Sequence, residues 1–208
     1  MKKSKRTKKS NSWKIRQHKD QFVKKSKKLG YRSRASFKLI DLNKKFKFIK
    51  KNTNLLDLGS SPGGWAQVAR KIITKGKILS VDTKFMKPIQ DIHFLNCDIF
   101  DPKIEEKINR FFLRQLDVII SDMAADTTGS KSLDSIRTNQ LCSKVLELSS
   151  NLLKSDGVVV SKLFMGEDFI EVKNLAKSLF KEVNFFKPDS SRNESKETYL
   201  HCKILKTL

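Results

Sequence analysis

NLLDLGSSPGGW, residues 54–65, is the stretch that decides the fold. Its apolar half is typical of a buried strand, and the glycines that follow predict a tight turn into a helix. Glycines let the backbone come close to a ligand, because no side chain stands in the way. The first N–H groups of the following helix attract an anionic group. The stretch therefore indicates a cradle for a cofactor that contains a nucleoside.

Two familiar phosphate-binding loops fit this stretch poorly. Gly59 and Gly64 have the spacing of a nucleoside-triphosphate loop, but Trp65-Ala66 stand where that loop needs Lys followed by Ser or Thr. Ser61 replaces the middle glycine of the dinucleotide fingerprint. S-adenosylmethionine requires only a site for one carboxylate and one ribose, so the sequence favours it as the cofactor. A plain strand-turn-helix connection remains the alternative without a ligand.

The rest of the chain predicts an α/β fold with a doubly wound, mostly parallel, seven-stranded sheet. Apolar runs and helical patterns alternate from residue 53 onward, which is the rhythm of parallel strands joined by helices. The last two runs have no helix between them and predict an antiparallel pair at the end of the sheet. The expected strands are 54–58, 77–82, 92–95, 116–121, 157–164, 183–186 and 198–205, and the expected helices are 64–74, 101–112, 133–153 and 166–180. We expect one domain over residues 32–208.

Positive charge is concentrated at the start of the chain. Residues 1–51 hold 21 of the 44 Lys and Arg but only two of the 22 Asp and Glu, so +19 of the net +22 lies there. A nearly pure cationic block is typical of contact with a polyphosphate backbone. We therefore expect residues 1–31 to form a basic, partly disordered RNA-binding arm. Residues 2–12 contain no apolar side chain, which argues against a membrane helix and a signal peptide.

Cysteine and histidine give no sign of a metal site. Cys97, Cys142 and Cys202 are widely spaced and odd in number, which is typical of free, buried thiols in a reducing compartment. The three histidines are equally scattered, so no metal ligand set is expected. We expect a monomeric cytoplasmic protein that binds no membrane.

Charged residues end several of the expected strands. They are Asp57, Asp82, Asp98, Asp122 and Lys162. Ligands of such sheets bind beyond the carboxyl ends of the strands, so these side chains are candidates for a binding site. Asp82 lies 18 residues after Gly64, which suits a carboxylate for the adenosine ribose hydroxyls. Asp98 could read an adenine amine.

With these positions identified, the chain resembles the FtsJ/RlmE family of RNA ribose 2′-O-methyltransferases over residues 32–205. The resemblance rests on six segments: RSRASFKL (32–39), the loop 57–65, SDMA (121–124), KLFMGE (162–167), KPDSSR (187–192) and ETY (197–199). It implies a Rossmann-like, class I fold that uses S-adenosyl-L-methionine. One departure is Ala125-Asp126, where the bacterial type commonly has Pro-Asn, and it concerns the shape of the loop on the substrate side.

The resemblance also implies roles for individual residues. Four correspond to the catalytic tetrad: Lys38, Asp122, Lys162 and Glu197. Five correspond to cofactor contacts: Gly63, Trp65, Asp82, Asp98 and Asp122. The bacterial type methylates a uridine of large-subunit (23S-type) ribosomal RNA, which aids ribosome assembly. The implied partner is therefore ribosomal RNA or a precursor of the large ribosomal subunit.

Lys162 is the candidate general base for a ribose hydroxyl, and it must be neutral to act. Burial and the charge of Lys38 would lower its pKa, whereas Asp122 and Glu197 would raise it. The sequence leaves that balance open. It also leaves open three other functions: 2′-O-methylation of transfer RNA or a messenger cap, RNA binding without catalysis during ribosome assembly, and a nicotinamide dehydrogenase.

Overall fold

A computed structural model describes residues 20–166, 168–192 and 194–206, so most of the predicted arm lies outside the described residues. The described chain contains a seven-stranded sheet in the order β3-β2-β1-β4-β5-β7-β6. The strands are β1 (Leu55–Leu58), β2 (Ile78–Asp82), β3 (His93–Asn96), β4 (Leu116–Ser121), β5 (Leu153–Phe164), β6 (Phe180–Phe186) and β7 (Glu197–Leu205). The predicted fold class is confirmed, including the antiparallel pair.

β7 is the one strand in this sheet that runs against the others. It lies between β5 and β6 and pairs antiparallel with both, whereas β1 to β5 pair in parallel. β5 is longer than the sequence predicts, because Leu153 already pairs with Leu116 ahead of a register shift before Val118. The strand that ends the chain thus occupies an interior position, where both of its neighbours hold it.

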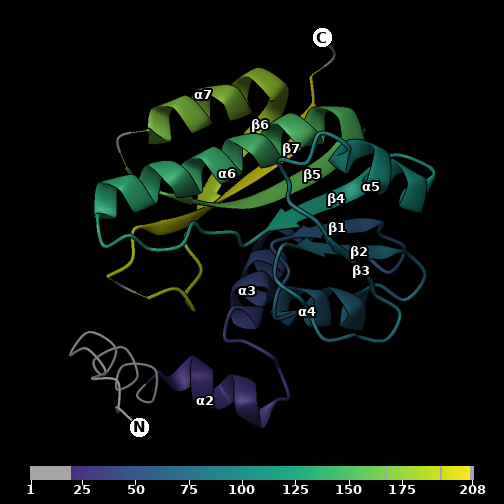
Figure 1. The fold of residues 1–208 in the computed structure, drawn as a ribbon, viewed down its shortest axis with the longest axis horizontal. Coiled ribbons are helices and arrows are strands. Elements are labelled where there is room, and N and C mark those ends of the chain that lie inside the picture. The colour runs from purple at the N-terminus through teal and green to yellow at the C-terminus, as the bar shows by residue number, and fades with distance from the viewer. Residues whose placement is uncertain (1–19, 167, 193, 207–208) are drawn as a thin grey trace, which may run out of the picture.

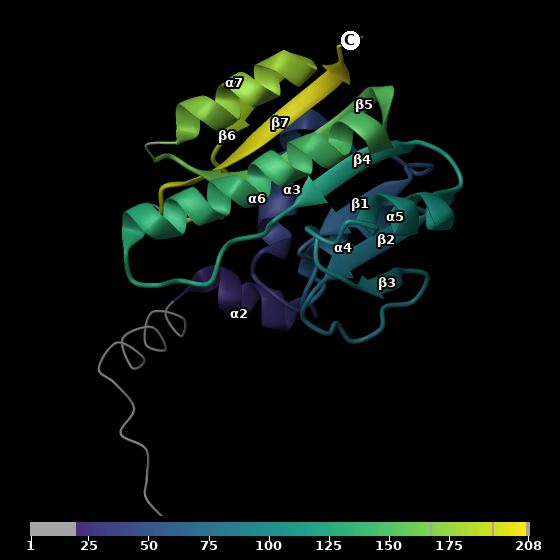
Figure 2. The same cartoon turned by 45° about the horizontal axis from the view of Figure 1, so that its top comes forward.

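Helices cover both faces of the sheet, as Figures 1 and 2 show. α5 (Ile104–Phe112), α6 (Lys131–Leu152) and α7 (Phe169–Leu179) lie on one face, and α3 (Ser36–Phe46) and α4 (Gly64–Ile72) lie on the other. Each face has its own apolar core: Leu56 and Val159 pack toward α6, whereas Leu55 and Val160 pack toward α3 and α4. Among residues 20–166, 168–192 and 194–206, no helix is both long enough and apolar enough to cross a lipid bilayer.

Alternation along the strands determines which face the polar side chains join. Successive strand residues point to opposite faces, so residues two apart share a face. Ile120 packs on the α3 and α4 face, and the same alternation places Asp122, which follows β4, on that side. Val160 also packs on this face, so Lys162, two residues later, points the same way. Tyr199 packs there too, so Glu197, two residues earlier, shares that face. The sheet therefore directs three charged side chains toward α3, the helix that carries Lys38.

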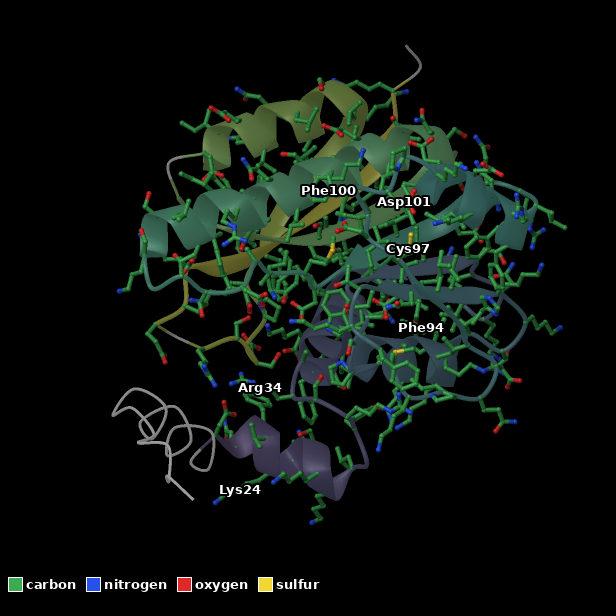
Figure 3. The ribbon with its side chains drawn as sticks, viewed as in Figure 1. Lys24, Arg34, Phe94, Cys97, Phe100 and Asp101 are labelled. Atoms are coloured by element: carbon green, nitrogen blue, oxygen red, sulfur yellow. The ribbon has the colours of Figure 1, made fainter. Side chains whose placement is uncertain are left out.

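A short helix, α2 (Gln21–Lys28), packs beside α3. Asp20 caps it by accepting the N–H of Phe22, and the Phe22 ring lies 5.4 Å from the Phe37 ring of α3. Asp20 also pairs with Arg34, whose other nitrogen donates to the Ser190 carbonyl. Figure 3 shows Arg34 between α2 and the body of the fold. Residues 20–28 of the predicted arm are thus fixed against the domain.

Candidate active site

The turn after β1 requires glycine at two positions. Gly59 has φ +75°, and a Cβ there would lie 2.2 Å from Cγ of Met123. Gly63 has φ +106°, and a Cβ there would lie 2.9 Å from Ile89 and 3.0 Å from Met86. Both conformations are unfavourable for residues with a side chain. Gly59 thus allows the turn to pack closely against the loop after β4, and Gly63 allows it to pack against the loop between β2 and β3.

A cavity of about 520 Å³ opens beyond the carboxyl ends of β1, β2 and β4. Its lining includes Asp82, Asp98 and Asp122, which are three of the five predicted cofactor contacts. Gly63 and Trp65 are not among the lining residues. Trp65 is buried in the core, and its indole N–H donates to the Ala35 carbonyl at 2.8 Å. Its placement is that of a packing residue behind the glycine turn.

Backbone N–H groups hold Asp82 in one orientation. One carboxylate oxygen accepts the N–H of Ser61 at 2.8 Å, and the other accepts the N–H of Lys84 at 2.7 Å. Asp98 accepts the N–H of Phe100 at 3.0 Å. A carboxylate has further lone pairs, so each of these acids can still accept a hydroxyl or an amine of a ligand. Their positions are fixed in advance of binding.

Asp57 is a buried acid that the predicted cofactor set omits. Its side chain is only 1% exposed, and one of its oxygens has no hydrogen-bond partner. Burial, together with the charges of Asp122 and Asp82, raises the pKa of Asp57 to about 8. A buried polar atom without a partner is costly, and ligand sites are one common reason for it. Asp57 therefore lies behind the cavity wall, close enough to feel the charges of Asp122 and Asp82, but it is not among the lining residues.

We expect Asp57→Asn to change how stability depends on pH. Between about pH 4 and pH 8 the folded protein keeps a proton on Asp57 that the unfolded chain loses, so the free energy of unfolding falls as pH rises. Asn does not titrate. Without cofactor, the variant should therefore gain in melting temperature over the parent from pH 5 to pH 9, by about 5 °C or more. Parallel curves of melting temperature against pH would contradict this.

Lys38, Asp122, Lys162 and Glu197 meet at one point, as the resemblance predicts. Lys162 Nζ lies 2.7 Å from Asp122 Oδ1 and 3.8 Å from Glu197 Oε2. Lys38 Nζ lies 2.7 Å from Glu197 Oε2 and 3.7 Å from Asp122 Oδ1. Each cation thus contacts both acids. Asp122 also lines the cavity, so this cluster and the cavity share a side chain.

The charges in this cluster stabilise one another. Burial favours neutral Lys162, but the carboxylates of Asp122 and Glu197 outweigh it, so the pKa of Lys162 lies above its ordinary value. Burial likewise opposes charge on Asp122, but Lys162 and Lys38 hold the pKa of Asp122 below its ordinary value. The balance that the sequence leaves open therefore favours charged Lys162 when no substrate is bound.

Two residues that the sequence analysis missed position the acids. Tyr199 is fully buried, and its hydroxyl donates to Asp122 Oδ1. Ser191 donates to Glu197 Oε1 at 2.8 Å. Tyr199 pairs with Lys162 across the β5–β7 ladder and stands two residues from Glu197, so strand alternation could have identified it. Ser191 has no such signal, because it lies in a loop.

Cys97 lies on the cavity wall beside Asp98. Its thiol donates to Asp101 at 3.3 Å, and Lys107 Nζ lies 3.3 Å from its sulfur. Figure 3 labels Cys97 and Asp101, together with Phe100. Burial, followed by the Asp101 hydrogen bond, raises the pKa of Cys97, so the thiol form is favoured. Within the described ranges, no three Cys, His, Asp or Glu side chains come together as a metal site.

Comparison with known proteins gives consistent results. A family model described as FtsJ-like methyltransferase matches residues 31–205. Two proteins named "Ribosomal RNA large subunit methyltransferase E" are each 42% identical to this chain. The one from Pelagibacter ubique aligns over 95% of this chain and 97% of its own length, and the one from Rickettsia akari over 94% and 89%.

One solved structure has the same fold as this chain. The crystal structure of a protein titled a ribosomal RNA methyltransferase, from Plasmodium falciparum, is 30% identical and superposes with a TM-score of 0.75. The match covers 84% of this chain and 98% of that one. The motifs and the family model agree over residues 31–205. The chain belongs to the FtsJ-like methyltransferase family.

Proposed function

We propose that this protein transfers a methyl group from S-adenosylmethionine to the ribose 2′-hydroxyl of a uridine in large-subunit ribosomal RNA. The observation that carries this proposal is the cluster of Lys38, Asp122, Lys162 and Glu197 beside the cavity. The relatives named for ribosomal RNA methylation support the choice of RNA. The substrate would be ribosomal RNA or a large-subunit precursor, and the protein would act as a cytoplasmic monomer.

The cavity suits S-adenosylmethionine better than a dinucleotide. Asp82, Asp98, Asp122 and Asp126 line it, against two cations, Lys84 and Arg137. An excess of carboxylates favours a sulfonium cation and ribose hydroxyls, and it disfavours a pyrophosphate. Asp82 would hold the ribose hydroxyls, Asp98 the adenine amine and Asp122 the methionine portion. The cofactor would supply an electrophilic methyl group on sulfur.

Lys162 would take the proton of the attacking hydroxyl. Its Nζ donates to the backbone carbonyl of Asp122 at 2.8 Å and to the carboxylate of the same residue, so the amine is fixed beside a residue that lines the cavity. The raised pKa means that Lys162 must first lose a proton to solvent. The hydroxyl oxygen then gains the methyl group while its proton passes to Lys162. Alignment of the reacting groups supplies much of the rate gain.

Lys38 and Glu197 would position the ribose. Their side chains pair at 2.7 Å, and Ser191 holds the other oxygen of Glu197. Both are largely buried, so the pair gives a fixed surface of donors and acceptors against which a hydroxyl can be oriented. A 2′-hydroxyl as the nucleophile makes the substrate RNA rather than DNA.

The proposal is tested by methyl transfer from labelled S-adenosylmethionine. The RNA is large-subunit ribosomal RNA, free and as particles, from cells that lack their own enzyme of this family. We expect one new 2′-O-methyluridine, mapped by its resistance to alkaline cleavage. Transfer RNA and capped messenger RNA serve as controls, and methylation of either in preference to ribosomal RNA would replace the proposed substrate. Tight binding of NAD in place of S-adenosylmethionine, measured by calorimetry, would exclude methyl transfer.

A further inference from the structure

The net positive charge of this protein belongs to its first 81 residues. Residues 1–81 hold 25 basic and three acidic side chains, whereas residues 82–208 hold 19 of each. The second set forms β3 to β7 and the α5, α6 and α7 face, where ion pairs such as Lys107 with Asp101 mix the signs. The whole net charge of +22 therefore belongs to the N-terminal segments, which include α2, α3 and α4.

Much of this charge lies outside the predicted arm. Residues 42–81 contain nine basic side chains and one acid, and that acid is the buried Asp57. Most of these cations lie near the amino ends of β1 and β2, in the loops 47–54 and 73–77 or in the helix ends beside them. The active-site cluster lies at the opposite, carboxyl ends of the strands. The fold thus divides the basic residues of 20–51 between the two ends of the sheet.

Six exposed lysines lie on segments that contact one another, and we call them the basic band: Lys27, Lys28, Lys50, Lys51, Lys71 and Lys75. The end of α2 joins α4 because Gln67 donates to the Gly30 carbonyl at 3.1 Å, and Lys71 Nζ lies 4.2 Å from the centre of the Tyr31 ring. The two loops join because the N–H groups of Thr74 and Lys75 donate to the Lys51 carbonyl.

The basic band lies away from the active-site cluster, and α2 extends from one toward the other. Asp20, at the start of α2, contacts Arg34 and Arg192, close to the loop whose Ser191 holds Glu197. From there α2 extends for about 12 Å and α4 for about 14 Å, at the usual rise per helical residue. In Figures 1 and 2, α2 lies beyond α3 and α4, on their side of the sheet. The acid beside the band, Asp91, is paired with Arg70.

We infer that the basic band binds the phosphate backbone of a ribosomal RNA segment other than the one that carries the target ribose. This inference rests on the proposed function for its RNA substrate. An exposed surface of one sign is unfavourable for the folded protein unless a polyanion neutralises it. RNA fits better than an acidic protein because the band is an extended row with few apolar side chains exposed between its lysines.

The test compares two triple variants that lose the same charge. K50Q/K51Q/K75Q removes exposed lysines of the band, and K103Q/K177Q/K181Q removes exposed lysines of the other face and edge. Affinity for full-length large-subunit ribosomal RNA is measured over a range of salt concentrations. We expect the band variant to lower the slope of log affinity against log salt by about 2 to 3, as for three lost phosphate contacts. The control variant should keep the parent slope.

Activity provides a second readout. On full-length RNA, the band variant should raise KM at least about tenfold and leave kcat unchanged. On a short oligonucleotide that carries only the target site, its KM should equal that of the parent. A band variant that matches the control in both slope and KM overturns the inference, and so does equal loss on the short RNA. Failure of the unchanged protein to methylate any RNA would instead refute the proposed function, because the salt slopes require no turnover.

Discussion

Lys162→Ala should reduce kcat for methyl transfer by about a thousandfold or more, which is within the usual contribution of a general base. The side chain is buried between Asp122 and Glu197, and no other cation in the cluster lies as close to Asp122. Because its action is confined to the transition state, cofactor affinity should stay within a few fold of the parent. Single-turnover rates and calorimetry with S-adenosylmethionine measure the two quantities separately.

Two further measurements make this prediction specific to a base. Lys162→Arg should recover little activity, because a guanidinium does not lose its proton in proteins. The parent rate should rise about tenfold per pH unit from pH 7 to 9 without a plateau, since the pKa of Lys162 is raised above its ordinary value. Lys154→Ala is the matched control: Lys154 lies on the same strand, is paired with Asp117, and is far from the cluster. Near-parental turnover in Lys162→Ala would leave the cluster as a positioning device.

Asp122→Ala should be damaging in three ways. It removes the carboxylate nearest to the buried Lys162 and the acceptor of the buried Tyr199 hydroxyl, which costs about 3–5 kcal/mol of folding stability. It removes a carboxylate from the cavity wall, so cofactor affinity should fall. Turnover should fall further, because Lys162 loses the partner that fixes its amine. Chemical denaturation, calorimetry and single-turnover kinetics report these effects in turn.

Asp117→Ala is the control for that variant. Asp117 lies on the same strand and accepts a cation, Lys154, and the N–H of Asn54. Its loss should lower stability but leave kcat and cofactor affinity unchanged, because it stands near the opposite end of β4. If Asp122→Ala lowered stability alone, as Asp117→Ala should, Asp122 would have no role in catalysis.

Much of the fold could be predicted because its local patterns are strong. The apolar runs of β1, β2 and β4 are short, dense and bounded by glycine or charge, so period and length both identify strands. The predicted start of β5 was less accurate. Residues Leu153 to Asp156 lack a strand pattern, and only pairing with β4 extends the strand to include them. The interior position of β7 was also not predictable, since strand order depends on contacts distant in sequence.

Part of the candidate site could also be predicted from the sequence. The ends of the expected strands identified Asp122 and Lys162, the family resemblance added Lys38 and Glu197, and the structure brings all four together. The direction of the Lys162 pKa could not be obtained from sequence, because it depends on distances between groups. The sequence also could not predict that one oxygen of Asp57 has no hydrogen-bond partner, because this depends on the neighbours of Asp57 in the fold.

The interior position of β7 has a consequence for how the protein is made. Glu197 and Tyr199 lie on this last strand, and Glu197 meets Lys38 across 159 residues of sequence. During synthesis, Lys38 emerges from the ribosome long before Glu197. Contacts so distant in sequence form late, because a long loop must close first. Until β7 pairs with β5 and β6, Lys38 and Lys162 have Asp122 but not Glu197 as an acidic partner. Activity should therefore appear only after β7 has been synthesised and has paired.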